Sequence, residues 1–435
     1  MYTDTAGRTY ARAQKGGRVM TQTGGARATG VQRAVNARAI RWLTYLMFFM
    51  FAMTTDSVGV IIPQVIAEFG LNLTAAGALH YGSMSAIALA GLGLGFLADR
   101  FGRKRTVLLG LGLFAAAAVL FPSAHSFAAL LVLMMISGTA IGVFKTGALA
   151  LVGDISRTPA QHTTTMNLVE GFFGLGAIVG PFLVTQMALA GVSWRWLYVI
   201  AGSLSLALMA LALSVRYPGA RHLPHAKGAG AQGGAGGSLA LLRDPYALGF
   251  SLAAFAYVAV ECAIVVWMPT LLSTYRGPAQ LLADYCLPAF FLLRALGRFA
   301  GAWLLGRADW TLALALCSGA ILLCFIGSLV GGNSAGVYLL PLAGIFTSIV
   351  YPTINSKGIA CFAPCNHGRV AGVILFFTCA GAALGPLAMG AVSDAFGGPV
   401  YGFVLATGFA MALAGVMTYN WMFKPAGARL AGLLP

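Results

Sequence analysis

The chain has 435 residues, of which 59% are hydrophobic and only 9% are charged, and its mean hydropathy is +0.84. A soluble domain is about 25% charged, so this composition excludes a soluble enzyme or a disordered scaffold and predicts that lipid is the main solvent. The net charge of +16 does not indicate a nucleic-acid surface, because the basic residues form short clusters beside apolar runs, without interleaved aromatic residues.

Apolar runs that are long enough to cross a bilayer recur along the whole chain. A hydrocarbon core of about 30 Å needs about 20 helical residues. Twelve runs are predicted, at residues 41–68, 75–98, 106–121, 127–152, 166–190, 195–214, 245–272, 282–305, 311–330, 337–360, 369–391 and 399–422. The third run is short, and we expect it to extend into its flanks. The predicted fold is an all-α polytopic membrane protein with twelve transmembrane helices in two six-helix bundles.

A Gly/Ala-rich stretch at 218–238 has no apolar period and separates the first six runs from the last six. The predicted parts are a disordered basic tail at 1–39, an amino-terminal bundle at 40–215, a linker at 216–244, a carboxy-terminal bundle at 245–424 and a tail at 425–435. The tail at 1–39 has the composition of a transit peptide, but no amphipathic helix emerges in it. A start at Met20 is the other alternative.

Basic residues predict the orientation of the chain in the membrane. Residues 1–41, 100–105 and 216–243 hold sixteen of the 27 Lys and Arg residues, whereas the predicted loops on the opposite side hold only Arg195 and Arg276. Short cytoplasmic loops carry an excess of Lys and Arg. Both termini are therefore predicted to be cytoplasmic, and we expect the protein in a bacterial inner membrane.

The two halves of the chain resemble each other at a fixed offset. Met268-Pro269 follows Ile62-Pro63 by 206 residues, and Gly385-Pro386 follows Gly180-Pro181 by 205 residues. Two parallel halves of six spans are typical of a transporter architecture in which two bundles rock about a site near the bilayer midplane.

The loop after the second run reads Gly95-Phe-Leu-Ala-Asp99-Arg100-Phe-Gly102-Arg103. A carboxylate at Asp99 can accept hydrogen bonds at a helix end and pair with Arg103. The loop resembles the G-x-L-a-D-r-x-G-r-k signature of the major facilitator superfamily. We expect Gly95, Asp99, Arg100, Gly102 and Arg103 to form a gating cluster that latches the cytoplasmic side.

Segments of the second half of the chain resemble a narrower family within this superfamily. Residues 296–304 and 348–359 are similar to the eighth and tenth spans of the fucose:proton symporters, and Asn167-Leu168 is similar to part of the fifth. The family's span-one carboxylate falls here at Gly59, and its span-four glutamate falls at Lys145. The resemblance therefore implies a transporter of a polar solute, but its proton-coupling pair does not carry over.

Ionisable residues inside the spans point to a site. A charge that faces lipid at a helix centre costs about 3 kcal/mol, so such side chains must face the interior, pair, or lie near an interface. Depth along the spans predicts a pair of Lys145 with Glu170 and a pair of Glu261 with Arg294. Ion pairing that is only structural stays an alternative. The residues are Asp56, Lys145, Glu170, Glu261, Arg294, Arg298 and Lys357.

Other patterns indicate packing and not chemistry. The Gly-rich sets at 91–95 and 171–180 follow no strand, so they indicate close helix packing and not a dinucleotide loop. The chain holds no G-x-x-x-x-G-K-[ST] motif, so ATP is not expected to drive transport. Seven cysteines in the second half are interpreted as small core residues. We expect no cofactor, no metal site and no enzymatic activity.

The predicted function is secondary active transport, as proton-coupled import of a sugar-like or anionic polar metabolite by alternating access. Efflux of drugs or metabolites is the alternative, and a membrane receptor or scaffold is the competing class. The expected partners are a small polar solute, a proton and the lipid bilayer, for a monomer that binds no nucleic acid. Candidate substrate-binding residues are Lys145, Asn167, Trp267, Arg294, Tyr351 and Asn355. Candidate proton-coupling residues are Asp56, Glu170 and Glu261.

The sign of the intramembrane charge refines this prediction. Lys145 replaces an acid, and with Arg294 and Arg298 it adds three cations to the cavity region. The sequence therefore favours a solute with a carboxylate, held by Lys145 or Arg294. A neutral sugar, with every cation paired inside the protein, is an alternative of nearly equal weight.

Overall fold

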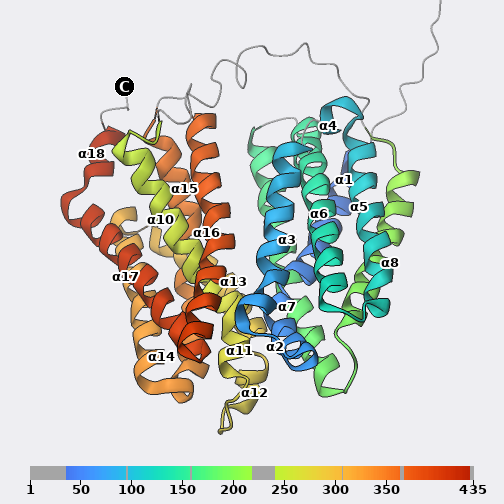
Figure 1. The fold of residues 1–435 in the computed structure, drawn as a ribbon. Helices are drawn as coiled ribbons and strands as arrows, with labels where there is room; N and C mark the ends of the chain where they lie inside the picture. Colours follow the sequence, from blue (N-terminus) through green and yellow to red (C-terminus); the bar gives the residue numbers. More distant parts are fainter. Residues whose placement is uncertain are drawn as a thin grey trace, which may run out of the picture. The chain divides into compact units, whose positions relative to one another are not determined.

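The computed structural model describes residues 36–94, 97–156, 159–217, 241–305, 307–362 and 367–431 (Figure 1). Within these ranges the chain is helical, with short turns and no strand. The predicted tail at 1–39 and linker at 216–244 lie mostly outside the described residues. The first bundle comprises α1 (Ala37–Thr55), α2 (Val58–Phe69), α3 (Leu73–Gly93), α4 (Leu97–Arg100), α5 (Arg103–Leu120), the 3₁₀ turn η1 (Phe121–Ser123), α6 (Phe127–Ile155), α7 (Pro159–Leu189) and α8 (Arg195–Ser214).

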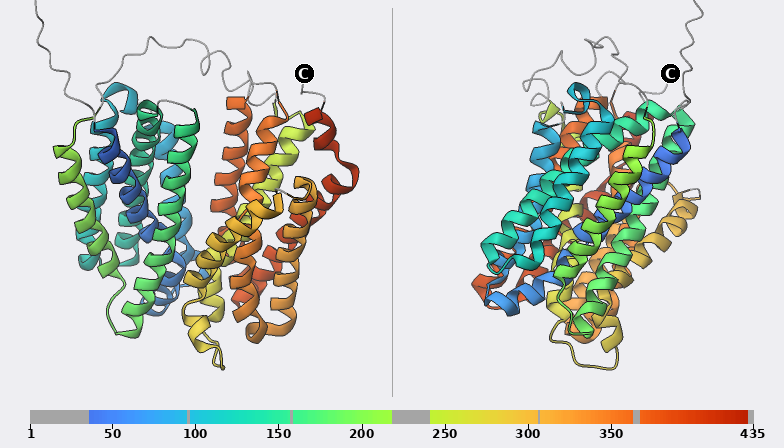
Figure 2. Two further views of the ribbon diagram at one scale, coloured as in Figure 1. Left: turned by 180° about the vertical axis from the view of Figure 1, so that it is seen from behind. Right: turned by 90° about the vertical axis from the view of Figure 1, so that its right-hand side faces the viewer.

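The second bundle repeats this succession with more irregular helices. It comprises α10 (Pro245–Cys262), the π-helix η2 (Ala263–Trp267), α11 (Met268–Leu272), α12 (Gln280–Asp284), α13 (Cys286–Leu305), α14 (Trp310–Thr347), α15 (Val350–Ala360), α16 (His367–Phe396), α17 (Pro399–Phe423) and α18 (Pro425–Ala431). Figure 2 shows the helices of both bundles running in the same general direction.

The helices agree with the twelve predicted runs. Nine segments of the described residues are long and apolar enough to cross a membrane. One of them, Trp310–Ala360, bends at Gly332, where φ is 60°, and so covers two predicted runs. Helices α3 and α13 occupy the remaining two positions. The third run begins earlier than its apolar core, at Arg103, because Gly102 takes the left-handed conformation that starts α5.

The internal repeat appears in the helix contacts. Glycines of α7 face backbone atoms of α1, and glycines of α16 make the equivalent contacts with α10, 205 or 206 residues further on. The contacts are those of Gly176 with Phe49, of Gly180 with Met53, of Gly381 with Phe255 and of Gly385 with Ala259. A methyl group at Gly176 or Gly180 would overlap a carbonyl oxygen of α1. The predicted packing role is confirmed for Gly176 and Gly180, whereas Gly91, Gly171 and Gly174 of the predicted sets meet open space.

Hydrogen bonds between described residues of the two bundles concentrate at one end of the helices. We call the end that holds α4 and α18 the α4 side, and the end that holds α12 the α12 side (Figure 1). The carboxylate of Asp394, where α16 ends, accepts hydrogen bonds from the start of α3. Thr185 and Gln186, near the end of α7, donate to residues 284 and 285. The bundles are therefore joined on the α12 side.

The first span of each bundle is interrupted at an equivalent place. Asp56 and Ser57 separate α1 from α2, and η2 separates α10 from α11, 206 residues later. A methyl group at Gly59 would overlap the carbonyl oxygen of Val265. The two interruptions therefore pack backbone against backbone. Irregular backbone inside a membrane protein is tolerated where it is buried in protein, and it often marks a site.

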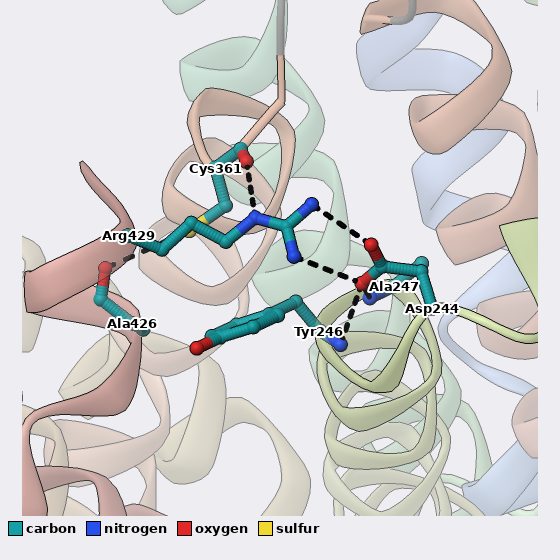
Figure 3. A network of polar contacts seen from close by, with 6 residues as sticks. All are labelled: Asp244, Tyr246, Ala247, Cys361, Ala426 and Arg429. Atoms are coloured by element: carbon teal, nitrogen blue, oxygen red, sulfur yellow. Dashed lines mark hydrogen bonds and ion pairs between the residues drawn. The ribbon is translucent and has the colours of Figure 1, made fainter. Parts of the chain in front are cut away.

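The predicted tail at 425–435 contains the short helix α18, which Arg429 fixes on the α4 side (Figure 3). Its guanidinium donates to both carboxylate oxygens of Asp244, at 3.3 and 2.8 Å, and to the carbonyl oxygen of Cys361 at 3.0 Å. The rings of Tyr246 and Phe362 lie beside the guanidinium. Helix α18 is thereby tied to the start of α10 and the end of α15.

Asp244 is the N-cap of α10 and lies just outside the membrane-spanning segment. Burial alone would raise the pKa of its carboxyl group. Hydrogen bonds from Arg429 and from the backbone amides of Tyr246 and Ala247 outweigh burial and hold that pKa below its ordinary value. The carboxylate therefore stays ionised at any pH near neutrality.

Candidate functional site

Glu261 and Arg294 form an ion pair between α10 and α13. Glu261 immediately precedes the last residue of α10, where the helix widens into η2, and Arg294 lies near the middle of α13. Both side chains are largely buried, and the Nε atom of Arg294 is buried without a hydrogen-bond partner among the described residues. The pair predicted from depth is confirmed. The Glu261 carboxylate thereby neutralises most of the charge of Arg294 within the protein.

Lys145, on α6, has a different environment. Its ammonium lies 5.1 Å from the centre of the Phe173 ring of α7. Among the described residues, no carboxylate comes within ion-pair distance of this ammonium. The predicted direct ion pair with Glu170 is therefore not formed, and the Glu170 side chain is exposed, but its charge still acts on Lys145 ahead of that of Asp56. Lys145 is a cation within a span that an aromatic face stabilises.

Asp56 lies at the break between α1 and α2, half-buried, and its Oδ2 atom accepts a hydrogen bond of 3.0 Å from the Thr55 hydroxyl. The charges of Arg294 and Lys145 both act on this carboxylate. Five ionisable groups from both bundles thus influence one another, namely Asp56, Lys145, Glu170, Glu261 and Arg294.

Aromatic and hydroxyl groups of the second bundle adjoin these charges. The rings of Tyr257 and Tyr351 stack with centroids 5.9 Å apart, and Thr378 lies 3.4 Å from the Tyr351 hydroxyl. Lys145 acts electrostatically on the thiol of Cys379, the next residue of α16. Tyr351 was predicted as a site residue. Tyr257 and Thr378 were missed, because neither a buried tyrosine nor a threonine in an apolar run carries a distinct sequence signal.

The remaining predicted binding residues occupy different places. Trp267 is 3% exposed, and its indole N–H donates to the carbonyl oxygen of Pro386 at 3.2 Å, so its ring is packed between helices. Asn167 is exposed on α7, on the same side as Glu170, and Asn355 is partly buried on α15. Lys357 lies 5.5 Å from the Trp310 ring near the α4 side, as a snorkelling lysine would.

The predicted gating cluster lies on the α4 side of the first bundle. Gly95 lies outside the described residues, as does the side chain of Asp99. Arg100 is exposed beside the neighbouring Phe101 ring. Gly102 takes φ of 87° with open space beyond it. Arg103 pairs with Asp154 of α6 at 3.1 Å, which ties the loop to its own bundle.

Comparisons with known proteins give the relatives of the chain. The profile described as the Major Facilitator Superfamily matches residues 44–386. The chain is 26% identical over 385 residues to the L-fucose-proton symporter of Escherichia coli (strain K12), covering 81% of this chain and 86% of that protein. It is 29% identical over 176 residues to the 4-hydroxybenzoate transporter PcaK of Pseudomonas putida, covering 40% and 39%.

A solved structure gives the same fold. The crystal structure of the nucleoside transporter NupG covers 88% of this chain and 98% of its own, at 14% identity and a TM-score of 0.70. This likeness concerns the fold alone.

Proposed function

The chain belongs to the Major Facilitator Superfamily, and from this premise we propose that it imports an anionic or sugar-like polar metabolite together with a proton, by alternating access. The resemblance predicted from the loop at 95–105 and from the spans at 296–304 and 348–359 is thereby confirmed. The protein is an integral membrane transporter. Its solute and its coupling ion are the subjects of the proposal.

One observation carries the choice of solute: among the described residues no carboxylate lies within ion-pair distance of Lys145, on which Glu170 and Asp56 act only from further away, whereas Arg294 is paired with Glu261. A cation within a span is stable only if an anion or a polar group meets it at some stage of the cycle. A carboxylate of the solute would do so through a charge-assisted hydrogen bond. Lys145, and not Arg294, is therefore proposed as the counter-charge.

Asp56 supplies a simple means of coupling. While Asp56 is ionised, its charge acts on Lys145 alongside that of Glu170 and competes with a bound anion. A proton on Asp56 removes that competition, so proton and anion favour each other's binding. Glu261 is a less suitable carrier, because its charge is held by Arg294. The joint binding of a proton and an anion is what a symporter requires.

A neutral sugar is the second candidate. The relative with the greater coverage is described as a fucose symporter, whereas the other is described as a transporter of an aromatic acid. Tyr351 offers a hydroxyl and a ring face, which suit either solute. Efflux of drugs is the alternative to import. It is favoured if a deletion strain becomes sensitive to many lipophilic compounds while growing normally on every carbon source.

We place the α4 side in the cytoplasm of a bacterial inner membrane, because the basic residues at 100–105 and 216–243 flank its helices. The bonds that join the bundles then lie on the external side, and this conformation is closed toward the exterior. We propose that a monomer carries out the cycle.

Uptake into proteoliposomes tests the proposal. Purified protein is reconstituted, and the uptake of labelled sugars, sugar acids and carboxylates is measured under an imposed pH gradient. Proton-dependent uptake of an anion is expected, with its loss in Lys145→Gln and its retention in the control Lys357→Gln. No accumulation of any solute under either a pH or a sodium gradient contradicts the coupling. Uptake of a neutral sugar that is unaffected by Lys145→Gln favours the second candidate.

A further inference from the structure

The first turn of α3 lies at the contact between the two bundles on the α12 side. The first four N–H groups of a helix have no partner within it. Asp394 of the other bundle accepts hydrogen bonds from the N–H groups of Leu73 and Thr74, each at 2.8 Å, and from the Thr74 hydroxyl. The side chain of Asn72 accepts from the next amide, that of Ala75, at 2.8 Å. A carboxylate of one bundle therefore caps a helix of the other.

This cap depends on the two bundles being in contact. Negative charge is favourable at a helix N-terminus, because the unpaired N–H groups and the helix dipole both point toward it. If the bundles separate at this end, Leu73 and Thr74 lose their acceptor, and Asp394 must be solvated by water alone. The interaction thus belongs to the conformation that is closed on the α12 side.

Neighbouring residues are shaped for the same contact. Gly390 lies one turn before Asp394, and a methyl group there would lie 3.2 Å from both the Cα atom of Thr74 and the ring of Trp267. A methyl group at Gly77 of α3 would lie 3.0 Å from that same ring. Trp267 therefore fills the space between the helices, and the two glycines leave room for it. The cap and the packed indole close this end together.

The sequence around Asp394 repeats the pattern of the predicted gating loop. Gly390, Asp394, Phe396 and Gly397 have the same spacing as the Gly, Asp, Phe and Gly of the segment at 95–102. The loop at 95–102 follows α3 on the α4 side, whereas the repeat at 390–397 closes α16 on the α12 side. The pattern thus places an aspartate close to a helix end on both the α4 side and the α12 side.

We propose that Asp394 is a gating residue, whose cap on α3 keeps the α12 side closed and whose release is needed for that side to open. This inference rests on the proposed transport cycle. Its test uses no solute, so an error in the proposed substrate does not change the result.

Hydrogen–deuterium exchange of the full-length protein in lipid nanodiscs tests it. Wild type is compared with Asp394→Ala and with Glu68→Gln, a control on the same side whose carboxylate pairs with Arg195 within its own bundle at 2.7 Å. In Asp394→Ala the amides of residues 73 and 74 are expected to exchange at least about tenfold faster. Peptides at the α12-side ends of α2 and α16 should also exchange faster, and those at the α4-side ends of α3 and α16 more slowly.

Two results overturn the proposal. Unchanged exchange at residues 73 and 74 in Asp394→Ala means that the cap is not formed in the membrane. Faster exchange at these residues alone means that Asp394 is a local cap and not a gate. If Asp394→Ala does not fold, Asp394→Asn and Gly390→Ala replace it. Gly390→Ala moves Thr74 away from Asp394 and must then give the same two-sided pattern.

Discussion

Lys145 and Arg294 are both cations within spans, but among the described residues only Arg294 has a carboxylate within ion-pair distance. Replacing Arg294 with Gln leaves Glu261 as a buried carboxylate without its partner. Breaking a buried pair in this way costs about 3–5 kcal/mol of folding stability. Replacing Lys145 with Gln removes a cation that lies against the Phe173 ring. A cation–π contact contributes about 0.5–2 kcal/mol, and the relief of charge burial offsets it.

We therefore expect Arg294→Gln to lower the free energy of unfolding by about 3–5 kcal/mol and Lys145→Gln to change it by less than about 1 kcal/mol. For binding of an anionic solute we expect the opposite order, with Lys145→Gln the more damaging of the two substitutions. Loss of a hydrogen bond to a charged group costs about 1.5–3 kcal/mol, so Lys145→Gln should weaken binding by about 10- to 150-fold.

Denaturant unfolding in detergent, followed by tryptophan fluorescence, measures the first quantity. Ligand-induced stabilisation over a panel of sugars, sugar acids and carboxylates measures the second, because a ligand that binds the native state raises its stability. Lys357→Gln is the matched control, since Lys357 also lies beside a ring but near a helix end.

Two results would refute the reasoning. If Lys145→Gln and Arg294→Gln both bind and transport the identified solute with unchanged affinity, neither cation is its counter-charge. If Lys145→Gln is as unstable as Arg294→Gln, and adding Glu170→Gln restores it, then Lys145 and Glu170 form a structural pair after all.

Other parts of the molecule give three further predictions. Gly176→Ala should destabilise the first bundle by at least about 1–3 kcal/mol by overpacking, while Gly174→Ala, which meets open space, should be tolerated; melting temperatures compare the two. Arg429→Gln should release α18, seen as faster protease cleavage at 424–431. The carboxyl pKa of Asp244 is depressed in the folded state. The stabilisation that its carboxylate gives to the folded state is therefore complete at pH values above the ordinary pKa of 3.8, and it is lost only as the pH falls through the lower pKa of the folded state. Cleavage of the wild type should therefore not change between pH 7 and pH 5.

The spans and their grouping were predictable from the sequence, because a bilayer demands long apolar runs and tolerates few charges. The Glu261–Arg294 pair was predictable too, since two opposite charges at the same depth on neighbouring spans have few other partners. The contact of Lys145 with Phe173 was not. It depends on how α6 and α7 are rotated about their axes, and low amphipathicity in buried helices leaves that rotation unspecified.

Trp267 and Asp394 illustrate a second limit. An indole in an apolar run suits a sugar ring, but Trp267 ends the π-helix η2 and is buried, with its N–H donating to the carbonyl oxygen of Pro386. The substrate role of Trp267 stays a prediction. Asp394 looks like any acid at a helix end. Only its spacing from Gly390 distinguishes it, and only the position of α3 shows what it caps.

The position of the acid in the first span follows from the packing of the two bundles. In the fucose:proton symporters, which this chain resembles, a carboxylate occupies the place that Gly59 holds here. A side chain at Gly59 would overlap the carbonyl oxygen of Val265, so the close contact between α2 and η2 excludes one. One turn earlier, Asp56 lies at the break between α1 and α2, where it has room for its carboxylate and the Thr55 hydroxyl as a donor. The chain thus keeps an acid near the middle of its first span and still packs the two bundles backbone to backbone.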